Sequence, residues 1–266
     1  MVKKLLKHEF KYYLRILMFV LPIILSVGIT FRLVLWYPND SVYYQILVFL
    51  LYSLVMFTMG ASMIFTSILG VIRFFKNMYG QEGYLTFTLP VSNKQHLFVK
   101  AFTNVVCQLA VASFNMLSIF IILTAIPQHF GWQWLYNIVT SGSLGHIISF
   151  SFDIIILMIV SSIMTTGMIY LCISIGQMVN KNRILLSIGI YYGFGVVAEI
   201  IYFSFYIVLI IMGMIGLLDP IVSFLENYPI TFFHTIIYML IIAFAALAFL
   251  YYSLVIKIMN NKLNLE

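Results

Sequence analysis

The chain has 266 residues, of which 63% are hydrophobic and 8% are charged, with a net charge of +6. A soluble domain carries about 25% charged residues and only about half apolar residues, so this chain does not cover its own surface with polar groups. The composition excludes an ordinary soluble domain. It predicts an all-α polytopic integral membrane protein whose residues 1–266 form a single transmembrane domain.

Residues 1–15 predict a basic amphipathic helix that lies in the headgroup layer of the membrane. At 100° per residue, one face carries lysines, an arginine and a histidine, and the other carries apolar side chains that include Phe10. Glu9 falls on the apolar face. We expect this carboxylate either to snorkel or pair locally, or to contact another segment of the protein.

Six apolar segments follow, each long enough for one membrane crossing of about 20 residues. The predicted spans are 16–36, 43–72, 97–126, 147–178, 184–205 and 230–256. The apolar run that begins at residue 184 extends to residue 218, and as one straight helix it would measure about 52 Å. The hydrocarbon core measures only about 30 Å. We therefore expect span 5 to end near Phe205 and a re-entrant or external segment to occupy residues 206–229.

The basic residues determine the predicted orientation. With both termini in the cytoplasm, every Lys and Arg except Arg32 lies on the cytoplasmic side, as the positive-inside rule requires. The same rule accounts for the basic excess, so we expect no nucleic-acid partner. The sequence thus predicts a multi-pass protein of the plasma membrane in which residues 73–96 form a cytosolic loop.

Motifs for nucleotide or metal chemistry are missing from the sequence. It contains no G-x-x-x-x-G-K-[ST] phosphate loop, no H-E-x-x-H and no paired-cysteine motif. We therefore expect no enzymatic activity, no metal site and no cofactor on this chain. Two carboxylates, Asp153 and Glu199, do fall within predicted spans. Each is either hydrogen-bonded inside the bundle or a candidate to line a transport pathway.

The stretch from residue 73 to residue 100 carries a recognisable pattern. It reads E-G at 82–83, then a short apolar and Thr run, then L-P-V-S at 89–92, with Lys100 opening the next span. Together with the N-terminal amphipathic helix and the six spans, this resembles the permeases of type-2 ABC transporters. The resemblance is greatest to the small permeases of Gram-positive bacteria that are linked to the export of antimicrobial peptides or to immunity against them.

The resemblance implies that the loop forms a coupling helix. It also implies two partners: a separate cytosolic ATP-binding-cassette ATPase, which would hold the ATP and Mg²⁺, and a second permease chain, identical or related. The residues implied in coupling to the ATPase are Arg73, Lys76, Gly80, Glu82, Gly83, Pro90 and Ser92.

Span 5 contains Gly189-x-x-x-Gly193, a spacing that offers a close-packing face to a second chain or to another helix of the same chain. The uncharged, aromatic-rich spans favour an apolar or amphipathic substrate. Two other functions stay open. One is an ion-coupled secondary carrier that uses Glu199 and Asp153, and the other is a non-transporting membrane subunit that senses a peptide or gives immunity against it.

Overall fold

The computed structural model describes residues 2–80, 83, 91–123, 144–179, 182–217 and 219–261, and the regular structure of these residues is entirely α-helical. Six of the helices in this part of the chain are long and apolar enough to cross a membrane, so the predicted all-α polytopic fold is confirmed. The helices are α1 (Val2–Leu35), α2 (Val42–Met78), α4 (Asn93–Leu123), α6 (Leu144–Gly176), α7 (Arg183–Met214), α8 (Asp219–Asn227) and α9 (Pro229–Asn261).

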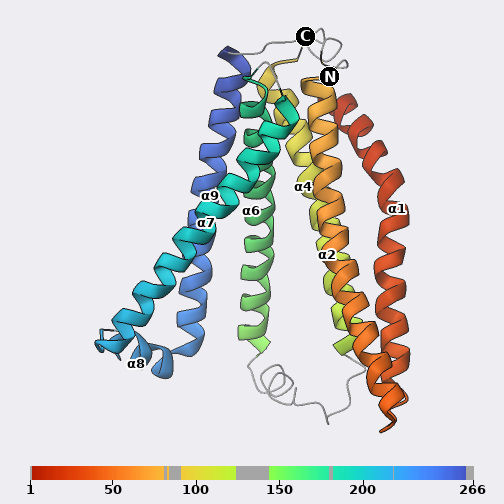
Figure 1. Ribbon diagram of the computed structural model, residues 1–266, viewed down its shortest axis with the longest axis vertical. Helices are drawn as coiled ribbons and strands as arrows, with labels where there is room; N and C mark the ends of the chain where they lie inside the picture. The colour runs from red at the N-terminus through yellow and green to blue at the C-terminus, as the bar shows by residue number, and fades with distance from the viewer. Residues whose placement is uncertain are drawn as a thin grey trace. The chain divides into compact units, whose positions relative to one another are not determined.

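The chain divides into two compact units (Figure 1). Unit 1 comprises Met1–Met78 and Glu82–Ser143 and contains α1, α2 and α4. Unit 2 comprises Tyr79–Gln81 and Leu144–Glu266 and contains α6, α7, α8 and α9.

Helix α1 is one helix through both the predicted interfacial segment and the predicted span 1. No turn separates residues 2–15 from the span, and Pro22 lies within the helix. The basic side chains of the first four turns are exposed, as the amphipathic pattern predicts. Buried positions recur every three, four or seven residues, the spacing of one helical face. They are Glu9, Tyr13, Leu17, Ile24, Gly28, Phe31 and Leu35.

The core of unit 1 forms where α4 packs against both α1 and α2. Apolar side chains fill it at two levels. One cluster joins Tyr13 and Leu17 of α1 to Leu69 of α2 and Val111 of α4. The other cluster contains Phe31, Leu35, Val55 and Ile122.

Unit 2 is built on the contact of α6 with α9. Helix α7 packs on α6 near the turn that joins them, where a Cβ atom at Gly176 would lie 1.9 Å from Ser187 Oγ. Asn182 takes the left-handed conformation (φ 55°) at this turn, which Asn tolerates better than most residues. From there α7 runs obliquely across the unit (Figure 1).

The helix that begins at Arg183 extends further along the apolar run than the expected span 5. Helix α7 continues past Phe205, the predicted end of span 5, to Met214. A helix of 32 residues measures about 48 Å, so it accommodates a core of about 30 Å by tilting or by protruding from it. The chain then turns at Gly216, whose φ of 71° favours glycine, into the short helix α8.

Candidate functional site

A buried carboxylate joins all three helices of unit 1. Glu9 Oε2 of α1 accepts a hydrogen bond of 2.9 Å from Arg73 Nε of α2. Glu9 Oε1 accepts hydrogen bonds of 3.1 Å from Asn77 Nδ2 of α2 and 3.1 Å from Lys100 Nζ of α4. Glu9 and Lys100 are only 3% and 4% exposed. We call these four residues the Glu9 hub.

The hub is a consequence of helix geometry at one end of unit 1. Arg73 and Asn77 are four residues apart in the last turns of α2, so both side chains face α1. Arg73 also lies over the ring of Tyr12, 4.5 Å from its centroid. Glu9 is the first position of the buried face of α1. Of the two alternatives for Glu9, the structure therefore shows the contact with other segments.

The hub connects the two sides of the predicted coupling loop. Asn77 comes just before the loop in sequence and Lys100 comes two turns into the helix after it. One carboxylate of α1 thus binds the helix that enters the loop and the helix that leaves it. Because breaking a buried ion pair is costly, α1, α2 and α4 are held together at this end.

The predicted loop is shorter than expected, because α2 continues to Met78 and α4 begins at Asn93. Arg73 and Lys76 are consequently helical residues of α2. Gly80 lies in a bend after α2, and Gly83 is buried. Glu82 and Pro90 lie outside the described residues, so their predicted role in coupling stays a prediction.

Ser92 begins α4. Its Oγ accepts a hydrogen bond from the backbone N–H of Gln95 (3.4 Å), and Gln95 Oε1 accepts one from the N–H of Ser92 (3.2 Å). This reciprocal pair is a capping box, which satisfies backbone donors at a helix N-terminus. The Pro-Val-Ser segment therefore ends in a helix cap. This cap fixes the first residue of α4 and thereby the position of Lys100 along the helix.

Polar side chains and glycines continue from the hub along the contacts of α4 with α1 and α2. Asn115 Nδ2 donates to Ser62 Oγ (3.2 Å), and Ser118 Oγ donates to the carbonyl of Ile24 (3.4 Å). Two glycines pack closely against polar side chains of α4. A Cβ added at Gly70 would lie 2.4 Å from Asn104 Oδ1, and a Cβ added at Gly28 would lie 2.1 Å from Ser118 Oγ. We call this set the polar seam: Gly28, Ser62, Gly70, Asn104, Asn115 and Ser118.

Tyr79 follows α2 in sequence but belongs to unit 2. Its O–H donates a hydrogen bond of 2.9 Å to Ser174 Oγ of α6. Burial raises the pKa of the Tyr79 hydroxyl above its ordinary value, so this group stays a donor at neutral pH. The stretch from Arg73 to Lys100 therefore contributes residues to both compact units.

The first pathway candidate, Asp153 of α6, is buried. Its Oδ2 pairs with Nδ1 of His234 on α9. The ring of Tyr238 stacks on that of His234, and Phe150 meets it edge-on, each with its centroid 6.2 Å from the imidazole. Asp153 is thus hydrogen-bonded inside the bundle, one of the two alternatives expected for it.

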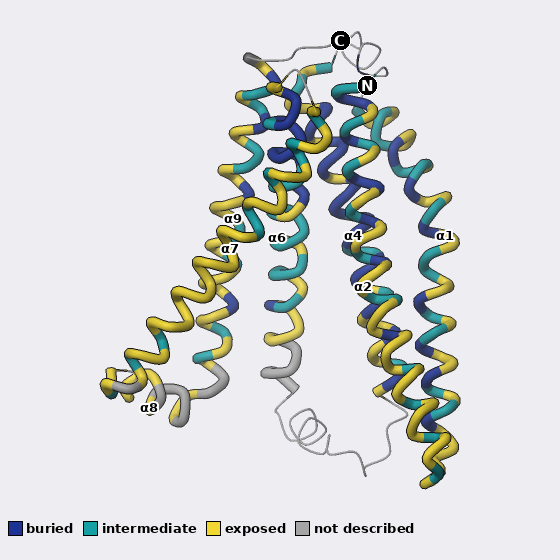
Figure 2. Tube along the Cα trace, in the orientation of Figure 1, coloured by how far each residue is buried: buried dark blue, intermediate teal, exposed yellow. Residues whose placement is uncertain are grey.

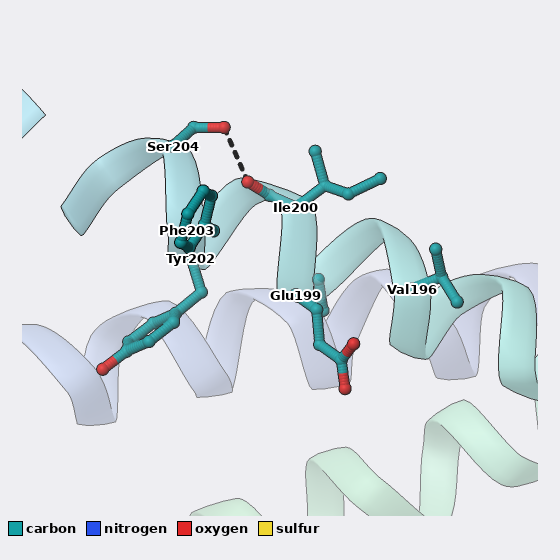
Figure 3. Close-up of a pocket in the computed structure, with 7 residues that line it drawn as sticks. Val196, Glu199, Ile200, Tyr202, Phe203 and Ser204 are labelled. Atoms are coloured by element: carbon teal, nitrogen blue, oxygen red, sulfur yellow. Dashed lines mark hydrogen bonds between the residues drawn. The ribbon is translucent and has the colours of Figure 1, made fainter. Parts of the chain in front are cut away.

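The second pathway candidate, Glu199, is exposed on α7. It lines an open concavity with neighbouring residues of the same helix, and Figure 3 shows its carboxylate and the ring of Tyr202 extending to the same side of that helix. Gly189 and Gly193 also have open space around them, because a Cβ at either position would meet nothing within 4 Å. Among the described residues, no other helix packs against this pair.

Sequence reasoning missed two members of these sites. Asn77 was not singled out, although it lies one turn beyond Arg73 at the end of an apolar run. The sequence also did not indicate His234 as the partner of Asp153, although both are ionisable residues inside apolar segments that have few others. Ionisable residues placed singly on different spans are the signal that would have found such pairs.

No group of three or more His, Cys, Asp and Glu side chains that would hold a metal ion occurs in the described part of the chain. In comparisons with known proteins, no family model, no curated protein and no solved structure matches the chain.

Proposed function

We propose that this chain is the membrane-spanning permease subunit of an ATP-binding-cassette exporter of the type-2 class. It moves an apolar or amphipathic substrate, such as an antimicrobial peptide or a drug, with energy from ATP hydrolysed by a separate cytosolic ATPase. Two permease chains, identical or related, work with the ATPase in the plasma membrane, and both termini of this chain lie in the cytoplasm.

The main support for this proposal is the Glu9 hub. A motor bound to the loop between α2 and α4 moves the spans only if the helix ends on either side of the loop respond together. Asn77 before the loop and Lys100 after it bind the same carboxylate of α1. A rigid-body displacement of the loop would therefore carry three helices rather than one.

The polar seam supports the same interpretation further along these helices. Lipid is as apolar as the side chains it surrounds, so helices associate in the membrane through close packing and interhelical hydrogen bonds. The contacts of Ser62 with Asn115 and of Ser118 with α1 supply such close packing and interhelical hydrogen bonds along α4. Movement at the hub would therefore reach deep into the membrane without loss of packing.

The experiment that tests the proposal is affinity purification of the tagged chain from native membranes, with mass spectrometry of the proteins that accompany it. We expect a stoichiometric P-loop ATPase that is lost with Glu82→Lys. The matched control is Asp219→Lys, a charge reversal on α8 that should leave the ATPase bound. The absence of any ATPase under gentle detergents, or equal recovery with Glu82→Lys, would contradict the proposal.

A second candidate function is an ion-coupled secondary carrier, which the pair formed by the buried Asp153 and the partly buried His234 favours. Ionisable pairs inside a membrane domain are typical of proton relays in carriers. A carrier would transport its substrate in proteoliposomes without ATP and in response to a proton gradient, and Asp153→Asn would abolish that transport. ATP-dependent transport that ignores the gradient would exclude this function.

A further inference from the structure

Glu199 lies where a carboxylate requires a partner. It is 16 positions from Arg183 and 15 from Met214, so it stands about 24 Å and 22 Å from the two ends of α7. It is exposed, and among the described residues no side chain forms a hydrogen bond or ion pair with it. A carboxylate so far from both ends of an apolar helix is costly to place in hydrocarbon, and such residues are typical of functional sites.

The surroundings of Glu199 combine one negative charge with apolar and aromatic side chains. The concavity is lined by Val196, Ile200 and Phe203 as well as by Tyr202. Tyr202 is three residues from Glu199, so their side chains are neighbours on the helix surface, and Figure 3 shows them on the same side of α7. A carboxylate beside an aromatic ring attracts an organic cation both by charge and by the ring face.

The charge on Glu199 argues against a second copy of this chain as the occupant of the concavity. A symmetric self-contact centred on Glu199 would bring two carboxylates together. The nearest cation of α7 in the described residues, Arg183, is too far along the helix to compensate for that repulsion. The glycine pair at 189 and 193 lies about 100° around the helix from Glu199, so a close-packed helix contact there would use a different face.

We propose that Glu199 and Tyr202 form a binding site for an amphipathic organic cation that reaches α7 from the membrane. The charged group of the ligand pairs with the Glu199 carboxylate, and its apolar body lies against Tyr202 and Phe203. The identification of this cation as the transported substrate rests on the proposed function, whereas the binding itself does not.

The test uses the full chain, purified and reconstituted in nanodiscs of zwitterionic lipid, with tetraphenylphosphonium as the probe. Tetraphenylborate has nearly the same shape and the opposite charge. We expect saturable binding of tetraphenylphosphonium above the lipid background and no saturable binding of tetraphenylborate. Equal binding of both ions, or no saturable binding of the cation, would overturn the proposal.

Four variants locate the site. We expect Glu199→Gln to weaken cation binding at least tenfold and Glu199→Asp to retain most of it. Tyr202→Leu should weaken binding by a smaller factor, because it removes only the aromatic contribution. Asp219→Asn removes the same charge from an exposed position outside the site and should leave binding unchanged. Unchanged binding with Glu199→Gln would overturn the proposal.

Two further readouts separate the possible failures. If Glu199→Gln alters the mass of the purified assembly while Glu199→Asp does not, Glu199 belongs to a subunit contact and the proposal is overturned. If the cation binds as expected but no ATPase accompanies the chain, the binding site stands and the proposed exporter function fails. If the ATPase is present but the cation does not bind, the exporter function stands and the binding site fails.

Discussion

The two units of this protein solve the same problem, helix association in lipid, in different ways. In unit 1, α4 is buried over 39% of its most apolar stretch and meets its neighbours through the polar seam and the Glu9 hub. In unit 2, the corresponding stretch of α7 has no buried residue. Figure 2 shows the same difference in the exposure of the two helices. One unit is joined by polar contacts along its length, and the other leaves one helix largely uncovered.

This difference indicates which helices of the protein are held rigidly together and which helix is free to contact another molecule. Hydrogen bonds between helices and close approach at glycine hold helices in lipid, because apolar contact alone distinguishes poorly between a helix and a lipid tail. Unit 1 has both devices, so we expect its three helices to move as one body. Helix α7 lacks them over most of its length and is therefore the helix on which another molecule has room to bind.

The largest expected effect comes from breaking the hub. Glu9→Ala removes the carboxylate that lies between Arg73, which is half-buried, and Lys100, which is buried. Breaking a buried ion pair in this way costs about 3–5 kcal/mol, so the free energy of unfolding should fall by that amount. Circular dichroism of the purified chain, titrated with sodium dodecyl sulfate in mixed micelles, measures this quantity.

Two comparisons show whether the loss comes from unpaired charge. Asp40→Ala removes a carboxylate from an exposed position and should change stability by less than about 0.5 kcal/mol. The double variant Glu9→Gln with Lys100→Met removes charge from both partners, so it should be more stable than Glu9→Gln alone. Equal stability of Glu9→Ala and the unaltered protein would show that the hub does not join the helices.

The same substitution at two glycines should have opposite effects in the two units. At Gly70 a new Cβ would lie 2.4 Å from Asn104 Oδ1 and 2.7 Å from its Cγ, so Gly70→Ala should cost about 1–3 kcal/mol. At Gly189 nothing lies within 4 Å, and Ala favours a helix over Gly by about 0.5–1 kcal/mol. The same titration measures both changes in the free energy of unfolding.

The result at Gly189 also sharpens the comparison between units. If Gly189→Ala destabilises the purified protein as much as Gly70→Ala does, this face of α7 is covered by another chain in the assembly. In that case the contrast between a packed unit and an open helix would apply to the single chain only.

A smaller effect is expected from the pair of Asp153 and His234 in unit 2. Asp153→Asn replaces the carboxylate that contacts Nδ1 of His234, but an amide side chain can still hydrogen-bond to the ring, and His234 is only partly buried, so less is left unsatisfied than at the Glu9 hub. We therefore expect a loss of about 1–2 kcal/mol, less than that of Glu9→Ala. The double variant Asp153→Asn with His234→Asn should lose no more than the sum of the single changes. A loss equal to that of Glu9→Ala would show that both pairs contribute alike.

The sequence was sufficient for the fold because long apolar runs leave helices as the usual solution in lipid. Helix ends were harder to predict. The bilayer thickness suggested an end near Phe205, but α7 continues to Met214, since a tilted or protruding helix is not limited by that thickness. The continuity of α1 was missed for a similar reason, because an amphipathic face and an apolar span can follow each other without a break.

The candidate site was predictable only in part. The position of Glu9 on an apolar face left open whether it snorkels or pairs locally or contacts another segment, and nothing local in the sequence indicated Arg73, Asn77 and Lys100 as the groups that bind it. Helix packing brings these residues to Glu9 although they are 64 to 91 positions from it in sequence. The open face of Glu199 is likewise a property of how α7 packs, and hydropathy reports only that the helix is apolar.

The smallest expected effect concerns the cap at the start of α4. Ser92→Ala removes the acceptor for the Gln95 N–H and should cost about 1 kcal/mol, because the capping box satisfies otherwise unpaired donors of the first turn. Hydrogen exchange should show faster exchange of the first-turn amides, with little change further along α4. Ser113→Ala, at an exposed position within the helix, should leave these amides unchanged. If Ser92→Ala also weakens protection around Asn115, the cap and the polar seam act together, and the register of α4 in unit 1 depends on where the helix begins.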